Sequence, residues 1–187
     1  MIHNKYANDY KLENVLDAKG RTVTKAIYKG VWYGFVKSPE EVKKASRRLA
    51  AAAGCAALSL AAGLSFYANT GFSAQYYTNI PFLVCAFPLI FLFVAVYSLF
   101  RPREKYTREQ KDKTGDRIAK TSFLGMLFSG VNLVGIIVAA ILKLTGVETR
   151  PVRLNDIIFI VFSVLLFAST IFAFSLRKEF VMEEMNN

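Results

Sequence analysis

Residues 157–176 of the chain read IIFIVFSVLLFASTIFAFSL, a run of 20 residues without a charged side chain. Asp156 precedes the run, and Arg177 and Lys178 follow it. A helix rises about 1.5 Å per residue, so about 20 apolar residues cross a bilayer core about 30 Å thick. The stretch is therefore predicted to be a transmembrane helix, and it decides the class of fold.

Three further stretches of the same kind precede it, at residues 49–67, 81–100 and 121–142. None of the four contains Asp, Glu, Lys, Arg or His, and 53% of the 187 residues are apolar. Four such blocks would leave a soluble protein of this length without a polar shell. We predict an all-α membrane protein, with residues 39–187 forming a bundle of four transmembrane helices.

Basic residues predict the orientation of this bundle. The segments before the first span, between the second and third (residues 101–120) and after the fourth hold 21 of the 24 Lys and Arg. Basic residues resist translocation, so these segments are expected in the cytoplasm of a cell membrane, together with both termini. The net charge of +10 is thereby assigned to membrane topology and to contact with anionic lipid headgroups, and no nucleic-acid partner is expected.

The segment 1–38 is predicted to hold a small cytoplasmic β-meander. Residues 17–20 have the Asp and Gly positions of a type I turn, between strands at residues 12–16 and 22–28. A second reversal at Lys29-Gly30 would fold residues 31–36 back on the second strand. This reversal would place Ile27 opposite Trp32 and Val23 opposite Val36.

Three short strands bury too little apolar surface to be stable alone, so the meander must lean on another surface. Trp32, Tyr33 and Phe35 are candidates for that contact, with the membrane surface or with a partner protein. The alternative is that these aromatic side chains form the core of the meander itself.

Two capping patterns predict helix starts. Ser38-Pro39-Glu40-Glu41 has a capping Ser, a Pro at the first helical position and a Glu at the third, so a helix is expected to run from there into the first span. Thr107–Gln110 repeats the pattern before the third span, where Thr114-Gly115 is expected to interrupt the helix.

Small residues recur at helix-packing spacing in two of the spans. In the third span these are Gly125, Ser129, Asn132 and Gly135, and in the first they are Ala53, Ala57, Ala61 and Ser65, with Ser59 and Gly63 as a second pair. Such rows let helix backbones approach closely, and an Asn can hydrogen-bond across helices. The first and third spans are therefore expected to form a central pair, with the more aromatic second and fourth facing lipid.

Two residues of the spans allow a second interpretation. Asn132 is the most polar residue at depth and either joins helices or lines a substrate path. Pro88 removes a backbone hydrogen bond from the second span and is expected to kink it, which could serve gating.

No catalytic, metal or cofactor site is expected. The single histidine, His3, lies far from the spans, and Cys55 and Cys85 fall at different depths. Gly130–Gly135 lacks the Lys and Ser or Thr of a phosphate-binding loop. Enzymatic activity is therefore not expected.

The N-terminal segment also carries a resemblance. Leu16–Arg21, Ala26–Gly30 and Trp32-Tyr33, together with Tyr77–Pro81, are similar to stretches in small uncharacterised multi-span proteins of Gram-positive bacteria. The resemblance implies no activity and no functional residues. It implies a bacterial cytoplasmic membrane.

Three functions remain open from the sequence. The first is a non-catalytic accessory or regulatory subunit that acts through contacts with a membrane protein. The second is a small homo-oligomeric transporter or channel with Asn132 and Pro88 at its pathway. The third, an enzyme acting on lipid at the cytoplasmic interface, would need an acid–base pair in the basic loop, where only scattered Glu and Asp occur.

Overall fold

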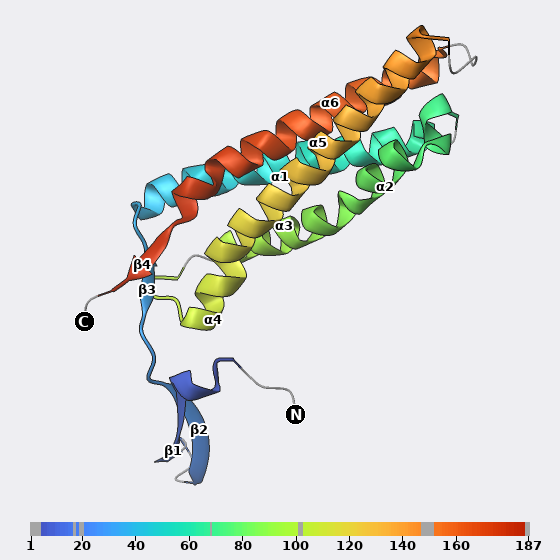
Figure 1. Cartoon of the computed structure of the whole chain (residues 1–187). Coiled ribbons are helices and arrows are strands. Elements are labelled where there is room, and N and C mark those ends of the chain that lie inside the picture. Colours follow the sequence, from blue (N-terminus) through green and yellow to red (C-terminus); the bar gives the residue numbers. More distant parts are fainter. Residues whose placement is uncertain are drawn as a thin grey trace.

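The computed structural model describes residues 5–16, 18, 21–67, 69–100, 103–146 and 152–185. Four helices, Pro39–Tyr67, Tyr76–Leu99, Arg108–Leu144 and Leu154–Phe180, are long and apolar enough to cross a membrane (Figure 1). Each contains one predicted span, apart from Phe100, which caps the second helix. The prediction of a mostly helical chain with four spanning-length helices is confirmed.

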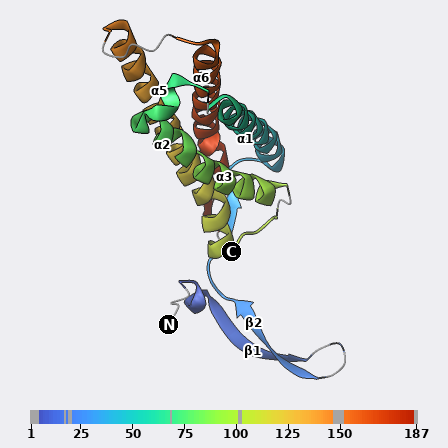
Figure 2. The ribbon, with the colours of Figure 1, turned by 90° about the vertical axis from the view of Figure 1, so that its right-hand side faces the viewer.

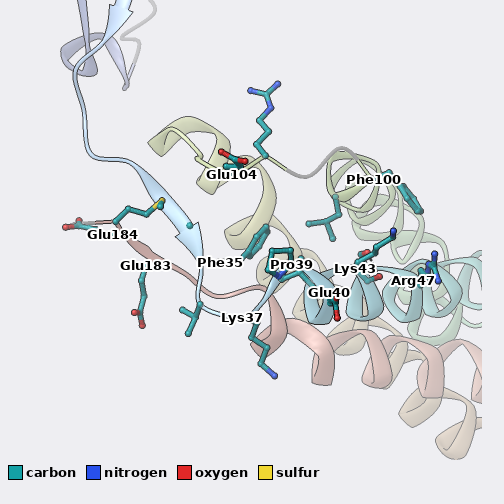
Figure 3. A pocket seen from close by; sticks show the side chains of 17 residues that line it. Phe35, Lys37, Pro39, Glu40, Lys43, Arg47, Phe100, Glu104, Glu183 and Glu184 are labelled. Carbon is teal, nitrogen blue, oxygen red and sulfur yellow. Dashed lines mark hydrogen bonds between the residues drawn. The ribbon is translucent and has the colours of Figure 1, made fainter. Parts of the chain in front are cut away.

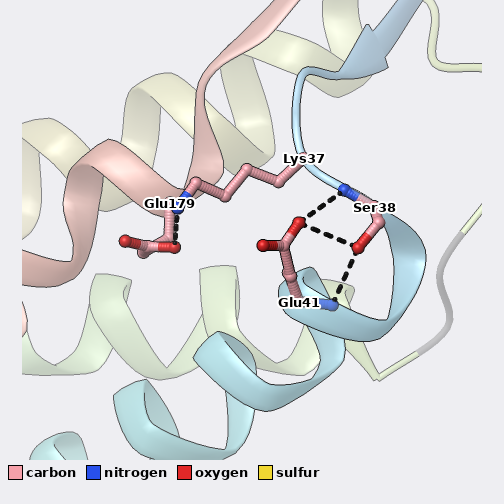
Figure 4. A network of polar contacts seen from close by, with 4 residues as sticks. All are labelled: Lys37, Ser38, Glu41 and Glu179. Carbon is pink, nitrogen blue, oxygen red and sulfur yellow. Dashed lines mark hydrogen bonds and ion pairs between the residues drawn. The ribbon is translucent and has the colours of Figure 1, made fainter.

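Helix α1 (Pro39–Tyr67) begins at the predicted capping box. The Ser38 hydroxyl accepts a hydrogen bond from the Glu41 backbone N–H at 3.4 Å, and the Glu41 carboxylate accepts one from the Ser38 N–H at 3.1 Å (Figure 4). These two bonds satisfy backbone donors that the first helical turn cannot satisfy by itself. The start of α1 follows directly from the local sequence.

The second membrane-spanning helix is divided into α2 (Tyr76–Val84) and α3 (Ala86–Leu99). The interruption falls at Cys85, three residues before Pro88. Because Pro88 has no N–H, the carbonyl of Val84 lacks its usual helical donor, and the helix breaks beside that carbonyl. The 3-10 helix η2 (Gly71–Ala74) connects α1 to α2.

The third helix runs through α4 (Arg108–Lys111), η3 (Asp112–Asp116) and α5 (Arg117–Leu144). Its capping box at Thr107 and Gln110 is formed as predicted. The expected interruption at Thr114-Gly115 is a π-helical turn within a continuous helix. A Cβ at Gly115 would lie 2.9 Å from the Phe180 carbonyl oxygen, so the glycine permits the close approach of the C-terminal segment.

Helix α6 (Leu154–Ser175) continues through the 3-10 helix η4 (Leu176–Phe180) into strand β4 (Met182–Glu184). It packs against both α1 and α5, while α5 packs against α2 and α3, and α1 against α3. Figure 2 shows α6 between α5 and α1. The expectation that the first and third spans form a central pair is therefore wrong, because α6, whose Phe159 and Leu166 are fully buried, packs against both of them.

The predicted three-stranded meander is also wrong. Strands β1 (Tyr10–Leu16) and β2 (Thr22–Tyr28), preceded by the 3-10 helix η1 (Ala7–Asp9), form the expected hairpin. Strand β3 (Tyr33–Phe35) pairs with β4 at the other end of the chain and not with β2. The predicted turn at residues 17–20 lies, except for Ala18, outside the described residues.

The choice of partner for β3 has a physical reason. In this pairing Phe35 packs on Phe180 at the end of η4, with ring centroids 6.5 Å apart, and Tyr33 is buried beside Met182 of β4. The β1–β2 hairpin projects away from the bundle (Figures 1 and 2) and leaves Leu12 and Leu16 each 71% exposed, so it offers little apolar surface for β3 to cover.

Candidate functional site

The small and polar residues predicted on the third span lie on the buried face of α5. Ser129 and Asn132 are fully buried, and Gly125 and Gly135 are buried with them. The Ser129 hydroxyl lies 2.8 Å from that of Thr170 on α6. This end of the row joins α5 to α6.

Asn132 and Gly135 join α5 to α2. The Asn132 Nδ2 donates a hydrogen bond to the Thr78 carbonyl oxygen at 2.9 Å. One turn further along, a Cβ at Gly135 would lie 2.6 Å from the Tyr77 carbonyl oxygen, so the two backbones meet with no room for a side chain. The four predicted residues are thus brought together along one helix face, in contact with two neighbouring helices.

Pro88 does not belong to this row. It is buried in α3, on the other side of the interruption at Cys85 from Thr78. The pathway residues suggested by the sequence therefore divide into a polar row on α5 and a separate break in the second helix.

Trp32, Tyr33 and Phe35 lie where β3 meets β4. Tyr33 is 8% exposed, and its backbone pairs with that of Tyr106 on the side away from β4. Phe35 contacts Tyr106 edge to face at 5.2 Å, and Trp32 contacts Tyr28 in the same way at 4.9 Å. Burial, and then the Glu184 carboxylate, raise the pKa of the Tyr33 hydroxyl. Tyr33 and Phe35, with Tyr106 and Met182, form the core of a small platform at the end of the bundle that carries both termini, called here the terminal end, whereas Trp32 is half-buried against the hairpin residue Tyr28.

A cavity of about 910 Å³ lies between this platform and the helices. We call it the terminal cavity (Figure 3). Its walls come from β3, the start of α1, the end of α3, the segment after α3, and β4, and the lining residues are Gly34 to Lys37, Pro39, Glu40, Val42, Lys43, Ser46, Arg47, Leu99, Phe100, Arg103, Glu104 and Glu183 to Met185.

Three of the four cations that line the terminal cavity have no counter-ion among the described residues. Lys43, Arg47 and Arg103 form no ion pair with any residue that the structure describes. The fourth cation, Lys37, is bound to Glu179 at 2.6 Å, which raises the pKa of Lys37 (Figure 4). In Figure 3 Lys43 and Arg47 lie on the side of Phe100, and Glu183 and Glu184 on the opposite side. Glu40 lies beside Lys43 in the same view, so the α1 side carries both signs of charge, with Lys43 and Arg47 toward Phe100, while the β4 side forms an acidic wall.

An apolar groove of about 440 Å³ lies in the seam between α1 and α3. It is lined by Ala50, Phe93, Val94, Val96, Tyr97 and Phe100. Phe100 lines both this α1–α3 groove and the terminal cavity, so the two are neighbours.

A different arrangement closes the opposite end of the bundle, called here the far end. Lys143 and Asp156 form an ion pair at 3.3 Å, with side chains only 5% and 1% exposed. The Asp156 carboxylate also accepts hydrogen bonds from the backbone N–H groups of Gly71 (2.8 Å) and Arg153 (3.0 Å). The Lys143 ammonium lies 4.7 Å from the centre of the Phe72 ring. One ion pair thus joins α5, α6 and the connection between α1 and α2.

Sequence reasoning missed both ends. In the sequence, Lys143 and Asp156 stand out only as charges next to the ends of two predicted spans. For the terminal cavity there was one signal: Lys43, Arg47 and Ala50 are spaced to share one face of α1. The other walls come from segments far apart in the sequence.

Neither family models, nor curated proteins, nor solved structures match this chain. Within the described residues, no three His, Cys, Asp or Glu side chains gather as a metal site would require. What the fold defines is a chain with four helices able to cross a membrane, and its function has to be argued from the surfaces those helices present.

Proposed function

We propose that this chain is a non-catalytic accessory or regulatory subunit of a larger membrane assembly, which it joins through α1. One observation carries the proposal: the outward face of the membrane part of α1 has more small residues than the outward faces of α3 and α5, with Leu58 and Leu64 as large exposed side chains among them. Its exposed positions include Ala51, Cys55, Ala61 and Ser65, and a Cβ added at Gly54 would meet nothing within 4 Å.

The outward faces of the other helices are large and apolar. On α3 they present Phe87, Ile90, Phe91, Val94 and Tyr97, and on α5 Leu127, Val131, Val134, Ile137 and Ile141. Such side chains are suited to lipid tails. Small residues instead let a second helix approach closely, where van der Waals packing drives association in a bilayer. The occupant favoured for the α1 face is therefore a transmembrane helix of a partner protein.

The proposal includes the orientation and the location. The terminal end is placed in the cytoplasm, because 21 of the 24 basic residues belong to the segments at that end. The platform of β3, β4 and Tyr106 and the β1–β2 hairpin would then face the cytoplasm, where they are available to regulate a partner. The membrane is taken to be the bacterial cytoplasmic membrane.

The geometry of the deep polar residues supports a structural role for them. Asn132 and Ser129 are fully buried and bonded to neighbouring helices, as expected of groups that join a bundle.

A homo-oligomeric transporter or channel is the second candidate, and one observation favours it. The Asn132 Oδ1 and the Thr78 Oγ1 are buried without a hydrogen-bond partner within the described residues. Buried polar atoms of this kind are unusual in a structural core and can mark a binding position.

The test is purification of the tagged protein from its native membranes in mild detergent, with mass spectrometry of the copurified proteins. We expect one partner in a fixed ratio to the tagged protein. Gly54→Leu should lose this partner, because the added side chain clashes with no residue of this protein but keeps a partner helix from approaching α1 closely. Val138→Leu, at an exposed position of α5, is the matched control and should retain the partner. A clean homo-oligomer in all three samples would contradict the subunit proposal and favour the transporter.

A further inference from the structure

We propose that the terminal cavity and the α1–α3 groove together hold one phospholipid with a zwitterionic phosphoethanolamine headgroup. The headgroup would occupy the terminal cavity, and one acyl chain would lie in the groove. This inference goes beyond the proposed function and does not depend on a partner protein.

The terminal cavity lies at the level of the membrane where lipid headgroups are expected. Arg47 lies at the last turn of α1 before its apolar part begins at Leu49, and Phe100 caps the end of α3. Both residues line the terminal cavity, which therefore opens at the level where the apolar part of the bundle ends. Its volume of about 910 Å³ is within the range of about 300–1,000 Å³ usual for small-molecule sites.

The groove continues the cavity toward the membrane interior. Ala50 follows Arg47 by one turn on the same face of α1, and its small side chain leaves the space between α1 and α3 open. The opposite wall is formed by Phe93, Val94 and Tyr97 of α3. A charged cavity that leads into an apolar groove matches a molecule with a polar head and a hydrocarbon tail.

The distribution of charge selects the headgroup. Lys43 and Arg47, on successive turns of α1, lie beside Phe100 and the groove, where a lipid phosphate would sit, and both can donate charge-assisted hydrogen bonds to it (Figure 3). Glu183 and Glu184 of β4 form the opposite wall, further from the groove, where they can accept from an ammonium group.

The numbers of positive and negative side chains in the cavity lining favour a zwitterionic headgroup over an anionic one. The cavity lining carries four cations (Lys37, Lys43, Arg47 and Arg103) and four anions (Glu40, Glu104, Glu183 and Glu184), and one of the cations, Lys37, is already paired outside the lining with Glu179. The Tyr33 hydroxyl already donates to Glu184 at 3.4 Å, but an anionic headgroup would bring no cation to Glu183 and Glu184, whereas a zwitterion places opposite charges against both walls.

The test uses the full chain in nanodiscs that contain phosphatidylethanolamine, phosphatidylglycerol and phosphatidylcholine with matched acyl chains. Native mass spectrometry after release should show one phosphatidylethanolamine retained per chain. Phosphatidylcholine has the same phosphate but no N–H, so the loss of retention from phosphatidylethanolamine to phosphatidylcholine measures the contribution of the acidic wall. Equal retention of phosphatidylglycerol would overturn the proposal.

Three variants test whether the cations of the cavity and the apolar groove bind the lipid. Lys43→Gln/Arg47→Gln should lower the retained lipid about tenfold, as expected when hydrogen bonds to a charged group are lost. Arg48→Gln, on the same turn of α1 but outside the cavity lining, is the matched control and should retain it. Ala50→Phe should fill the groove and displace the lipid with all charges intact, so the proposal stays testable if the double variant fails to fold. Equal lipid retention by the double variant and the control, or full retention by Ala50→Phe, contradicts the inference.

Competition with soluble glycerophosphoethanolamine distinguishes a membrane lipid from a soluble phosphoester with the same headgroup. It should displace the bound lipid poorly, because it lacks the chain that the groove binds. If it displaces the lipid at equal concentration, the ligand is a soluble phosphoester and the lipid proposal is overturned.

Discussion

Charged side chains at the two ends of the bundle differ in whether they have partners. At the far end Lys143 and Asp156 are buried and paired, and two backbone N–H groups complete the shell around the carboxylate. At the terminal end Lys43, Arg47 and Arg103 face a cavity and pair with no described residue. Charges that are paired and buried hold helices together, whereas charges left facing a cavity are available to a ligand. The far end is therefore suited to fixing the bundle and the terminal end to binding.

Removing one charge at the far end should have the largest effect. Asp156→Asn leaves the Lys143 ammonium buried without a counter-charge, and the free energy of unfolding should fall by about 3–5 kcal/mol. Denaturant unfolding in mixed micelles measures this loss. Lys143→Met/Asp156→Asn removes both charges and should recover part of it. If the single and double variants are equally unstable, the pairing of the charges is not what fixes this end.

The close contact of α5 with α2 should show the next largest effect. Gly135→Ala places a Cβ against the Tyr77 carbonyl oxygen, and the shift it forces should cost about 1–3 kcal/mol. Gly54→Ala, the same substitution on the open face of α1, should stabilise that helix by up to about 1 kcal/mol, because Ala is the better helix former. Opposite shifts in the unfolding midpoint are expected, and a loss in both variants would show that the α1 face is not open.

Asn132 should have a smaller effect. Asn132→Leu removes the hydrogen bond to the Thr78 carbonyl and should cost about 0.6 kcal/mol, and at most about 2 kcal/mol. The unfolding midpoint and the flux of candidate solutes in proteoliposomes are measured together. A variant that keeps its fold and assembly but loses a flux present in the wild type would place Asn132 on a pathway.

The ion pair between Lys37 and Glu179, at the terminal end, should have the smallest effect. Lys37 and Glu179 are 39% and 32% exposed, and water screens such pairs. Lys37→Met should therefore leave the unfolding temperature within the scatter of the wild type. A loss comparable to that of Asp156→Asn would remove the contrast between the two ends.

The helical part of the fold was predictable because its signals are local. A charge-free run such as residues 157–176 identifies a span without reference to the rest of the chain, and the Ser38 and Thr107 capping boxes lie within four residues each. The hairpin of β1 and β2 was predictable for the same reason, since its strands are adjacent in the sequence.

Pairings between distant segments were not predictable. Lys29-Gly30 offered β3 a nearby reversal, and nothing in the three residues Met182–Glu184 marks them as its actual partner. Lys143 and Asp156 each follow the usual pattern of a charge at a span boundary, and only the folded connections bring them together. The terminal cavity could not be seen from Lys43 and Arg47 alone, because its acidic wall is the same distant strand.

The pairing of β3 with β4 also imposes an order of events on biosynthesis. Strand β3 leaves the ribosome before any of the four membrane helices, and β4 leaves it after all of them. An open strand edge readily pairs with other chains, and during insertion only Tyr106 is available to cover one side of β3. A chain whose synthesis stops within α6 would keep that edge uncovered. The small sheet can therefore form only after all four membrane helices have been made.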